Sequence, residues 1–227
     1  RWPCQYRGWR ERDQADVAKA RRMAGESFNM TTNVNRSYPR TMTCDGGDVE
    51  LRLLTPADET AILAFAQKLS THDLLFLRRD IGQPKVVAAW MEATRNGTIV
   101  SVLATRQGAV LACATNSRDD LSWSRHVGEL RVLVDPTVRG LGLGQTLTQE
   151  AFAIALDMGL EKLMAQMTVD QRGAIGVFEG LGFRAEALLH DHVKDRDGKT
   201  HDIVILSHDV AKFQGQMAAY GMTEALE

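Results

Sequence analysis

The segment 129–145 constrains the fold of this chain more than any other part of it. It reads ELRVLVDPTVRGLGLGQ. The β-branched, apolar run at its centre is typical of a buried strand, and Asp-Pro followed by glycines ends a strand and opens a turn. A helical pattern begins at Gln145, so the segment predicts a strand, a tight glycine-rich turn and a helix N-terminus.

Such a turn is suited to binding an anion. Successive backbone N–H groups point outward at the start of the helix, and the helix dipole adds roughly half a positive charge there. Glycine at alternate positions leaves the amides open, because a Cβ would hold a phosphate group away from them. We therefore expect a diphosphate to bind at the turn formed by Gly140, Leu141, Gly142, Leu143, Gly144 and Gln145.

Two other glycine-rich phosphate loops do not fit this segment. A Walker loop requires Gly-Lys-Ser/Thr, whereas Gln145-Thr146 follows the last glycine. A dinucleotide-binding loop requires Gly-x-Gly-x-x-Gly and an acidic residue at the end of the next strand. Here the glycines are spaced differently, and the next expected strand, 160–168, ends in Met-Thr.

The spacing that does match is Arg/Gln-x-x-Gly-x-Gly/Ala, read here from Arg139 to Gly144. Downstream, residues 171–183 match Asn-x-x-Ala-x-x-x-Tyr-x-x-x-Gly-Phe, with Gln171 in place of Asn and Phe178 in place of Tyr. On these motifs the chain resembles the GNAT superfamily of N-acetyltransferases over about residues 48–210.

The resemblance implies an α/β (α+β) domain, the GNAT fold, with a central mixed, mostly antiparallel sheet of about seven strands flanked by helices. The expected order is β-α-α-β-β-β-α-β-α-β-β, which includes a helix over 84–95 and hairpin turns at 107–108 and 195–198. The resemblance also implies that acetyl-CoA is the co-substrate and that no metal is required. The residues expected to bind acetyl-CoA are Leu133, Val134, Arg139, Gly140, Leu141, Gly142, Leu143, Gly144, Gln145, Gln171 and Phe178.

Acetyl transfer to an amine requires a base, because a lysine amine with an ordinary pKa of about 10.4 is protonated at neutral pH. Glu129 resembles the catalytic glutamate of the bacterial protein-lysine acetyltransferase (Pat) type in place and spacing. Its apolar neighbours would desolvate it and raise its pKa. The alternative is a glutamate exposed at a strand end or paired with Arg131. Phe178 has no proton to give the CoA thiolate, so we expect it to pack beside the pantetheine.

The acceptor is the least constrained part of the sequence. Residues 52–58 and 75–79 resemble the Pat type, which favours a protein lysine. A small amine is the alternative substrate, and a non-catalytic acyl-CoA sensor is an alternative of a different class. The resemblance also leaves a homodimer open.

Composition limits the other classes of function and the domain organisation. The net charge of −2 over 227 residues gives no case for nucleic-acid binding, and no apolar run is long enough for a membrane span. Three widely spaced cysteines suggest reduced thiols in a cytoplasmic protein. We expect residues 1–47 to form a basic, partly ordered extension, in which a linker begins at residue 29. Residues 48–210 are expected to form the catalytic domain, and residues 211–227 a C-terminal tail. The histidines at 190, 192, 201 and 208 are expected to be ordinary strand residues rather than metal ligands.

Overall fold

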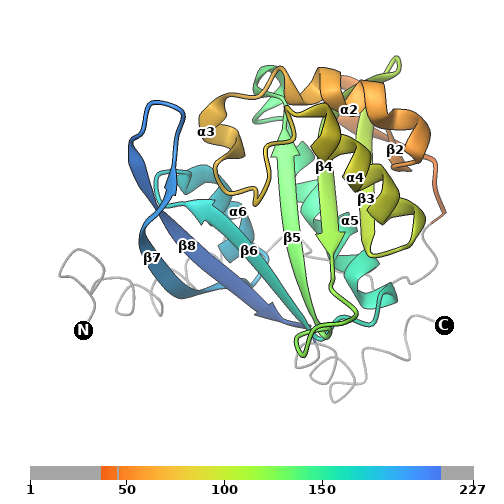
Figure 1. The fold of residues 1–227 in the computed structure, drawn as a ribbon. Helices are drawn as coiled ribbons and strands as arrows, with labels where there is room; N and C mark the ends of the chain where they lie inside the picture. Colours follow the sequence, from red (N-terminus) through yellow and green to blue (C-terminus); the bar gives the residue numbers. More distant parts are fainter. Residues whose placement is uncertain (1–36, 45, 211–227) are drawn as a thin grey trace, which may run out of the picture. The chain divides into compact units, whose positions relative to one another are not determined.

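The computed structural model describes residues 37–44 and 46–210. In this part of the chain, one eight-stranded sheet has the strand order β1-β2-β3-β4-β5-β6-β8-β7 (Figure 1). The strands are β1 (Arg40–Cys44), β2 (Gly47–Leu53), β3 (Ile99–Arg106), β4 (Ala109–Ser117), β5 (Val127–Val134), β6 (Lys162–Thr168), β7 (Arg184–Lys194) and β8 (Thr200–Asp209). The helical segments are η1 (Pro56–Asp58), α2 (Glu59–Ala66), α3 (Thr71–Leu74), α4 (Pro84–Arg95), η2 (Pro136–Val138), α5 (Leu143–Asp157) and α6 (Arg172–Gly180).

The sheet is mixed, and only its β5–β6 pair is parallel within the described residues. This confirms the expected fold class, but the order differs from the expected one by an additional strand before β2 and an additional helix between β2 and β3. Both hairpins turn where the sequence indicates. Gln107 and Gly108 have φ of 50° and 79° between β3 and β4, and Gly198 has φ of 83° between β7 and β8.

The eighth strand is β1, which lies in the region that the sequence assigned to a linker. Its five residues pair antiparallel with β2 at the edge of the sheet. Its start and the residues just before it contact α5: Tyr38 Oη donates to Glu150 Oε2 over 2.7 Å, and Arg40 forms an ion pair with Glu150. An exposed edge strand carries polar side chains, as a linker does, so composition alone did not separate the two. Residues 1–36 and 211–227 lie outside the described part of the chain.

Helices cover both faces of the sheet. A core of buried apolar side chains joins α2 and α4 to one face, and Leu103, Cys113 and Leu133 supply the strand side of that core. On the opposite face α5 contacts β3, β4 and β5, and the amide of Asn116 donates to the carbonyl of Ala151 over 2.6 Å. Burial raises the pKa of the Cys113 thiol to about 12, so this cysteine is an inert core residue.

The sequence pattern of residues 74–78 predicts a helix, but the helix in this region, α3, covers Thr71–Leu74 instead. Ser70 begins α3 with a capping box, in which its Oγ accepts from the amide of Asp73, and the helix ends at Leu74. The chain then turns, with the amide of Leu77 donating to the carbonyl of Leu74 over 2.9 Å. This turn carries Arg78 over strand β5, where it contacts Glu129.

Candidate functional site

The glycine-rich turn after β5 is built on a buried carboxylate. Asp135 is 2% exposed, and its Oδ1 accepts from the amide and the hydroxyl of Thr137 over 2.9 and 2.7 Å. Lys68 Nζ lies 3.2 Å from the other carboxylate oxygen. These contacts fix the direction in which the chain leaves the strand, and thereby the position of the turn.

The turn then passes through two left-handed residues into α5. Gly140 and Gly142 have φ of 83° and 79°, and Gly142 is the N-cap of the helix. A Cβ at either glycine would meet nothing within 4 Å, so the backbone conformation, not crowding, requires glycine there. At Gly144 a Cβ would lie 3.6 Å from Val134 Cγ2, directed at the strand.

The first turn of α5 presents free donors. The first intrahelical hydrogen bond runs from the amide of Thr146 to the carbonyl of Gly142, over 3.0 Å. The amides of Leu143, Gly144 and Gln145 therefore precede the helical ladder and have no carbonyl within the helix to bind. Together with the helix dipole they form an anion-binding surface. The geometry expected for a diphosphate-binding turn is present.

Arg139, at the start of this turn, is held by α3. Its Nη2 lies 2.7 Å from Asp73 Oδ1 and 3.4 Å from the carbonyl oxygen of Val134. Burial alone would raise the pKa of Asp73, but hydrogen bonds from Ser70 and Arg139 lower it overall. Half of the Arg139 side chain is exposed, so the guanidinium is also accessible to a bound anion.

Strands β5 and β6 separate beside the turn (Figure 1). Their parallel pairing covers only residues 127–129 of β5 and 162–164 of β6. The rest of β5 on that side, including Leu133 and Val134, leaves its backbone groups without a ladder partner on β6. A strand edge of this kind can form hydrogen bonds with an extended ligand, much as it would with another strand.

Two residues of the second motif lie at the far side of this gap. Gln171 is the N-cap of α6, and its buried Oε1 has no hydrogen-bond partner. A buried acceptor without a donor is costly, which suits an atom that receives an N–H from a bound molecule. Phe178 is 5% exposed and packs edge-on against Phe183, with ring centroids 5.0 Å apart. Its packing beside a pantetheine remains a prediction.

Glu129 lies near the start of β5, with its side chain 12% exposed. Its carboxylate accepts two hydrogen bonds from Arg131, over 3.0 and 2.8 Å, and Arg78 Nε lies 3.3 Å from Oε2. The expectation of apolar surroundings for this side chain is therefore wrong, because the guanidinium groups of Arg131 and Arg78 contact its carboxylate. Pairing with Arg131, the alternative that the sequence left open, is what the structure contains.

A cavity of about 320 Å³ adjoins Glu129 through Arg78. It lies between the α3 region and the turn of the β7–β8 hairpin. Four basic side chains line it against two acidic ones, Asp80 and Asp195, and the other lining residues are uncharged. The basic residues are Arg78, Arg79, Lys194 and Arg196.

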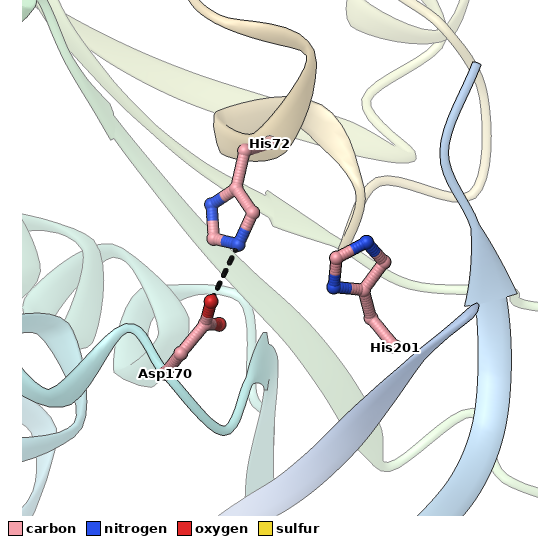
Figure 2. Close-up of side chains that lie close together, drawn as sticks. All are labelled: His72, Asp170 and His201. Carbon is pink, nitrogen blue, oxygen red and sulfur yellow. Dashed lines mark hydrogen bonds and ion pairs between the residues drawn. The ribbon is translucent and has the colours of Figure 1, made fainter. Parts of the chain in front are cut away.

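The sequence did not indicate that His72 and Asp170 lie close together. They are 98 positions apart, yet His72 Nε2 lies 2.9 Å from Asp170 Oδ2, with His201 beside them (Figure 2). Of the four C-terminal histidines, only His201 joins a cluster of potential ligands among the described residues, and its neighbours come from α3 and from the loop after β6. Contacts of such separation leave no spacing signal in one sequence.

The comparisons with known proteins agree with this geometry. The model of the acetyltransferase (GNAT) family matches residues 64–183, which is more than half of the chain. The chain belongs to the GNAT family. This confirms the expected family and, with it, an enzyme of the acetyltransferase class.

Similar proteins include a putative phosphinothricin acetyltransferase, YwnH, of Bacillus subtilis, which is 35% identical over 83 residues. That match spans 37% of this chain and half the length of the relative. A GNAT-family acetyltransferase from Streptococcus pneumoniae has a TM-score of 0.63 at 18% identity, covering 71% of this chain and 99% of that one. A Sinorhizobium meliloti phosphinothricin acetyltransferase, solved with acetyl-CoA, has a TM-score of 0.61 at 20% identity, covering 74% and 89%. The two relatives named as phosphinothricin acetyltransferases are not of the protein-lysine type that the sequence favoured.

No described helix is long and apolar enough to cross a membrane.

Proposed function

We propose that this chain transfers the acetyl group of acetyl-CoA to a primary amine. The observation that carries the proposal is that the free amides of residues 143–145 begin α5 just after the part of β5 that has no ladder partner on β6. A diphosphate on those amides directs an attached extended chain toward the unpaired edge of β5. Family membership and the acetyl-CoA complex of a relative with the same fold support the same ligand.

The pantetheine arm then lies along the part of β5 that has no ladder partner on β6. Its amides pair with the backbone of Leu133 and Val134, as a neighbouring strand would. Gln171 Oε1 accepts one N–H from the arm, which satisfies the buried oxygen. Phe178 lines the apolar side. Arg139 exchanges part of its contact with Asp73 for the diphosphate, a more highly charged partner.

Glu129 is the proposed base. Arg78 touches its Oε2 at 3.3 Å with a guanidinium on a 70% exposed side chain, so this partner is easily displaced by an incoming ammonium group. The carboxylate accepts the first proton, directly or through water, and the free amine attacks the thioester carbonyl. The C–S bond of the tetrahedral intermediate breaks, the CoA thiolate leaves, and the amide nitrogen gives its second proton to solvent water. Solvent protonates the thiolate, because Phe178 cannot.

We infer that the acceptor is a small amine that carries an anionic group. The basic lining of the cavity beside Glu129 favours a carboxylate or a similar group at one end of the acceptor. Relatives named as phosphinothricin acetyltransferases support a small acceptor. A protein lysine is the second candidate, favoured by the resemblance of residues 52–58 and 75–79 to the Pat type.

A free-thiol release assay with acetyl-CoA tests the proposal. The panel contains phosphinothricin, free amino acids, and lysine peptides that differ in flanking charge. We expect turnover with the anionic small amines and at most slow turnover with peptides. Peptide acetylation at a higher kcat/KM than any small amine would assign the protein-lysine activity. Acetyl-CoA binding without thiol release for any amine would instead indicate the acyl-CoA sensor.

A further inference from the structure

His72, Asp170 and His201 come from separate parts of the chain and meet at one point (Figure 2). His72 belongs to α3, Asp170 to the loop between β6 and α6, and His201 to the start of β8. One potential ligand atom from each lies within 4.8 Å of the other two. Donors around a tetrahedral zinc ion stand roughly 3.3 Å apart, so side-chain shifts of about 1 Å would complete such a site.

His201 is already oriented as metal-binding histidines usually are. Its Nε2 lies 2.8 Å from Asp195 Oδ2, which leaves Nδ1 available, and Figure 2 shows a ring nitrogen directed toward the other two residues. The Asp195 carboxylate is fixed in turn, because its Oδ1 accepts from the amides of Asp197 and Lys199 over 3.0 and 2.9 Å. A carboxylate on the second nitrogen of a ligating imidazole orients the ring and raises its basicity.

Ordinary ion pairing explains only part of this arrangement. A pair between His72 and Asp170 accounts for one imidazole, and a pair between His201 and Asp195 accounts for the other. Neither explains why both rings converge on Asp170, with centroids 5.7 Å apart and an interplanar angle of 78°. A cation bound between the three side chains would accept a lone pair from each imidazole.

We propose that His72, Asp170 and His201 bind a divalent transition-metal ion of the Zn²⁺ class. Two imidazole nitrogens and one carboxylate suit Zn²⁺, Co²⁺ or Ni²⁺, whereas Ca²⁺ and Mg²⁺ prefer oxygen ligands alone. Three protein ligands leave a fourth position open to water, and the exposed fractions of 39%, 58% and 13% for the three side chains leave a path for entry.

Such an ion joins α3 to the loop after β6 and to β8. The next residue along α3, Asp73, already contacts Arg139 of the diphosphate-binding turn. The bound ion therefore fixes α3 across the two sides of the β5–β6 gap. The proposal itself does not depend on acyl transfer, because metal binding and stability are measured without acetyl-CoA.

Calorimetric titration of Zn²⁺ into the chelator-stripped chain tests the proposal, with Co²⁺ absorption as a report on ligand geometry. We expect one ion per chain with a Kd of about 1 μM or tighter, and a rise in Tm on adding Zn²⁺ but not Mg²⁺. His72→Ala and His201→Ala should each weaken binding by roughly a hundredfold and remove the rise in Tm.

His190→Ala is the matched control. His190 is also exposed and lies 3.0 Å from a carboxylate, that of Asp202, but among the described residues no cluster of three or more potential ligands contains this pair. Zn²⁺ affinity should be unchanged in this variant. Tm values of the stripped variants near that of the stripped wild type would show that each still folds. Two results would overturn the proposal. One is no binding of Zn²⁺ to the wild type at about 100 μM, a concentration well above the expected Kd. The other is an equal loss of Zn²⁺ affinity in all three variants.

Discussion

Asp73 of α3 and Arg139 of the glycine-rich turn form an ion pair, with 2.7 Å between Oδ1 and Nη2. The neighbouring His72 contacts Asp170 on the other side of the β5–β6 gap. The four-residue helix α3 thus holds both loops that follow the parallel strands. Through Asp73, this helix competes with any anion that needs Arg139.

Asp73→Asn should tighten acetyl-CoA binding by up to about fivefold, because a partly exposed ion pair contributes up to about 1 kcal/mol and its loss frees Arg139. Isothermal titration measures the Kd. Asp80→Asn, which breaks a similar pair with Arg196 at 3.1 Å, should leave the Kd unchanged. Weaker binding in a folded Asp73→Asn variant would mean that the pair positions Arg139 for the ligand.

Glu129→Gln should lower turnover by roughly a hundredfold, the usual contribution of a general base, and leave acetyl-CoA affinity unchanged. The residual rate should rise with pH as the acceptor amine loses its proton in solvent. Glu92→Gln, which removes an exposed carboxylate paired with Arg95, is the control. Wild-type turnover of Glu129→Gln at pH 7 would place the base elsewhere and leave Glu129 as the partner of Arg131.

Asp58→Asn should destabilise the fold in a pH-dependent way. Hydrogen bonds from Arg52, at 2.9 and 2.6 Å, and from Thr55 lower the pKa of Asp58 to about 2. The ionised carboxylate therefore stabilises the folded state at pH values above the unfolded pKa of 3.8, by roughly 2 kcal/mol. This contribution falls as pH drops from about 4 to 2, where both states bind the proton.

Urea unfolding at pH 7 and at pH 2.5 measures this difference. The gap in free energy of unfolding between wild type and Asp58→Asn should be largest at pH 7 and shrink at the acidic pH. Asp120→Asn removes an exposed carboxylate that pairs with Arg118, and should change stability by less than about 0.5 kcal/mol at pH 7. A gap for Asp58→Asn that does not vary with pH would show that the carboxylate charge makes no contribution.

Local patterns predicted most of the fold. Helix α4 begins at its N1 proline, Pro84, and ends at Arg95 as expected, and the two-residue turn at Gln107 and Gly108 defines the first hairpin. These features depend on backbone preferences that a short segment reveals by itself. Strand β1 was missed because its polar side chains face solvent, which gives the segment no buried alternation.

The site was less predictable because its contacts are long-range. The glycine-rich turn is contiguous in sequence, and its left-handed glycines lie where the spacing indicates. The surroundings of Glu129 depend on Arg78, which reaches β5 only because α3 ends at Leu74. The approach of His72 to Asp170 follows from topology, since it needs the loop after β6 and α3 to meet over the gap.

The most direct measurement compares the affinities of acetyl-CoA and acetyl-pantetheine, which lacks the diphosphate, for wild type and Gly142→Val. Valine at a φ of 79° strains the turn by about 1–2 kcal/mol and displaces its amides. Gly159→Val is the matched control, because Gly159 has φ of 70° just beyond the other end of α5 with equally open surroundings. We expect Gly142→Val to weaken acetyl-CoA binding roughly tenfold or more, to leave acetyl-pantetheine binding unchanged, and Gly159→Val to affect neither. Unchanged acetyl-CoA affinity in folded Gly142→Val, or an equal loss for both ligands, would contradict a diphosphate bound on the amides of the glycine-rich turn.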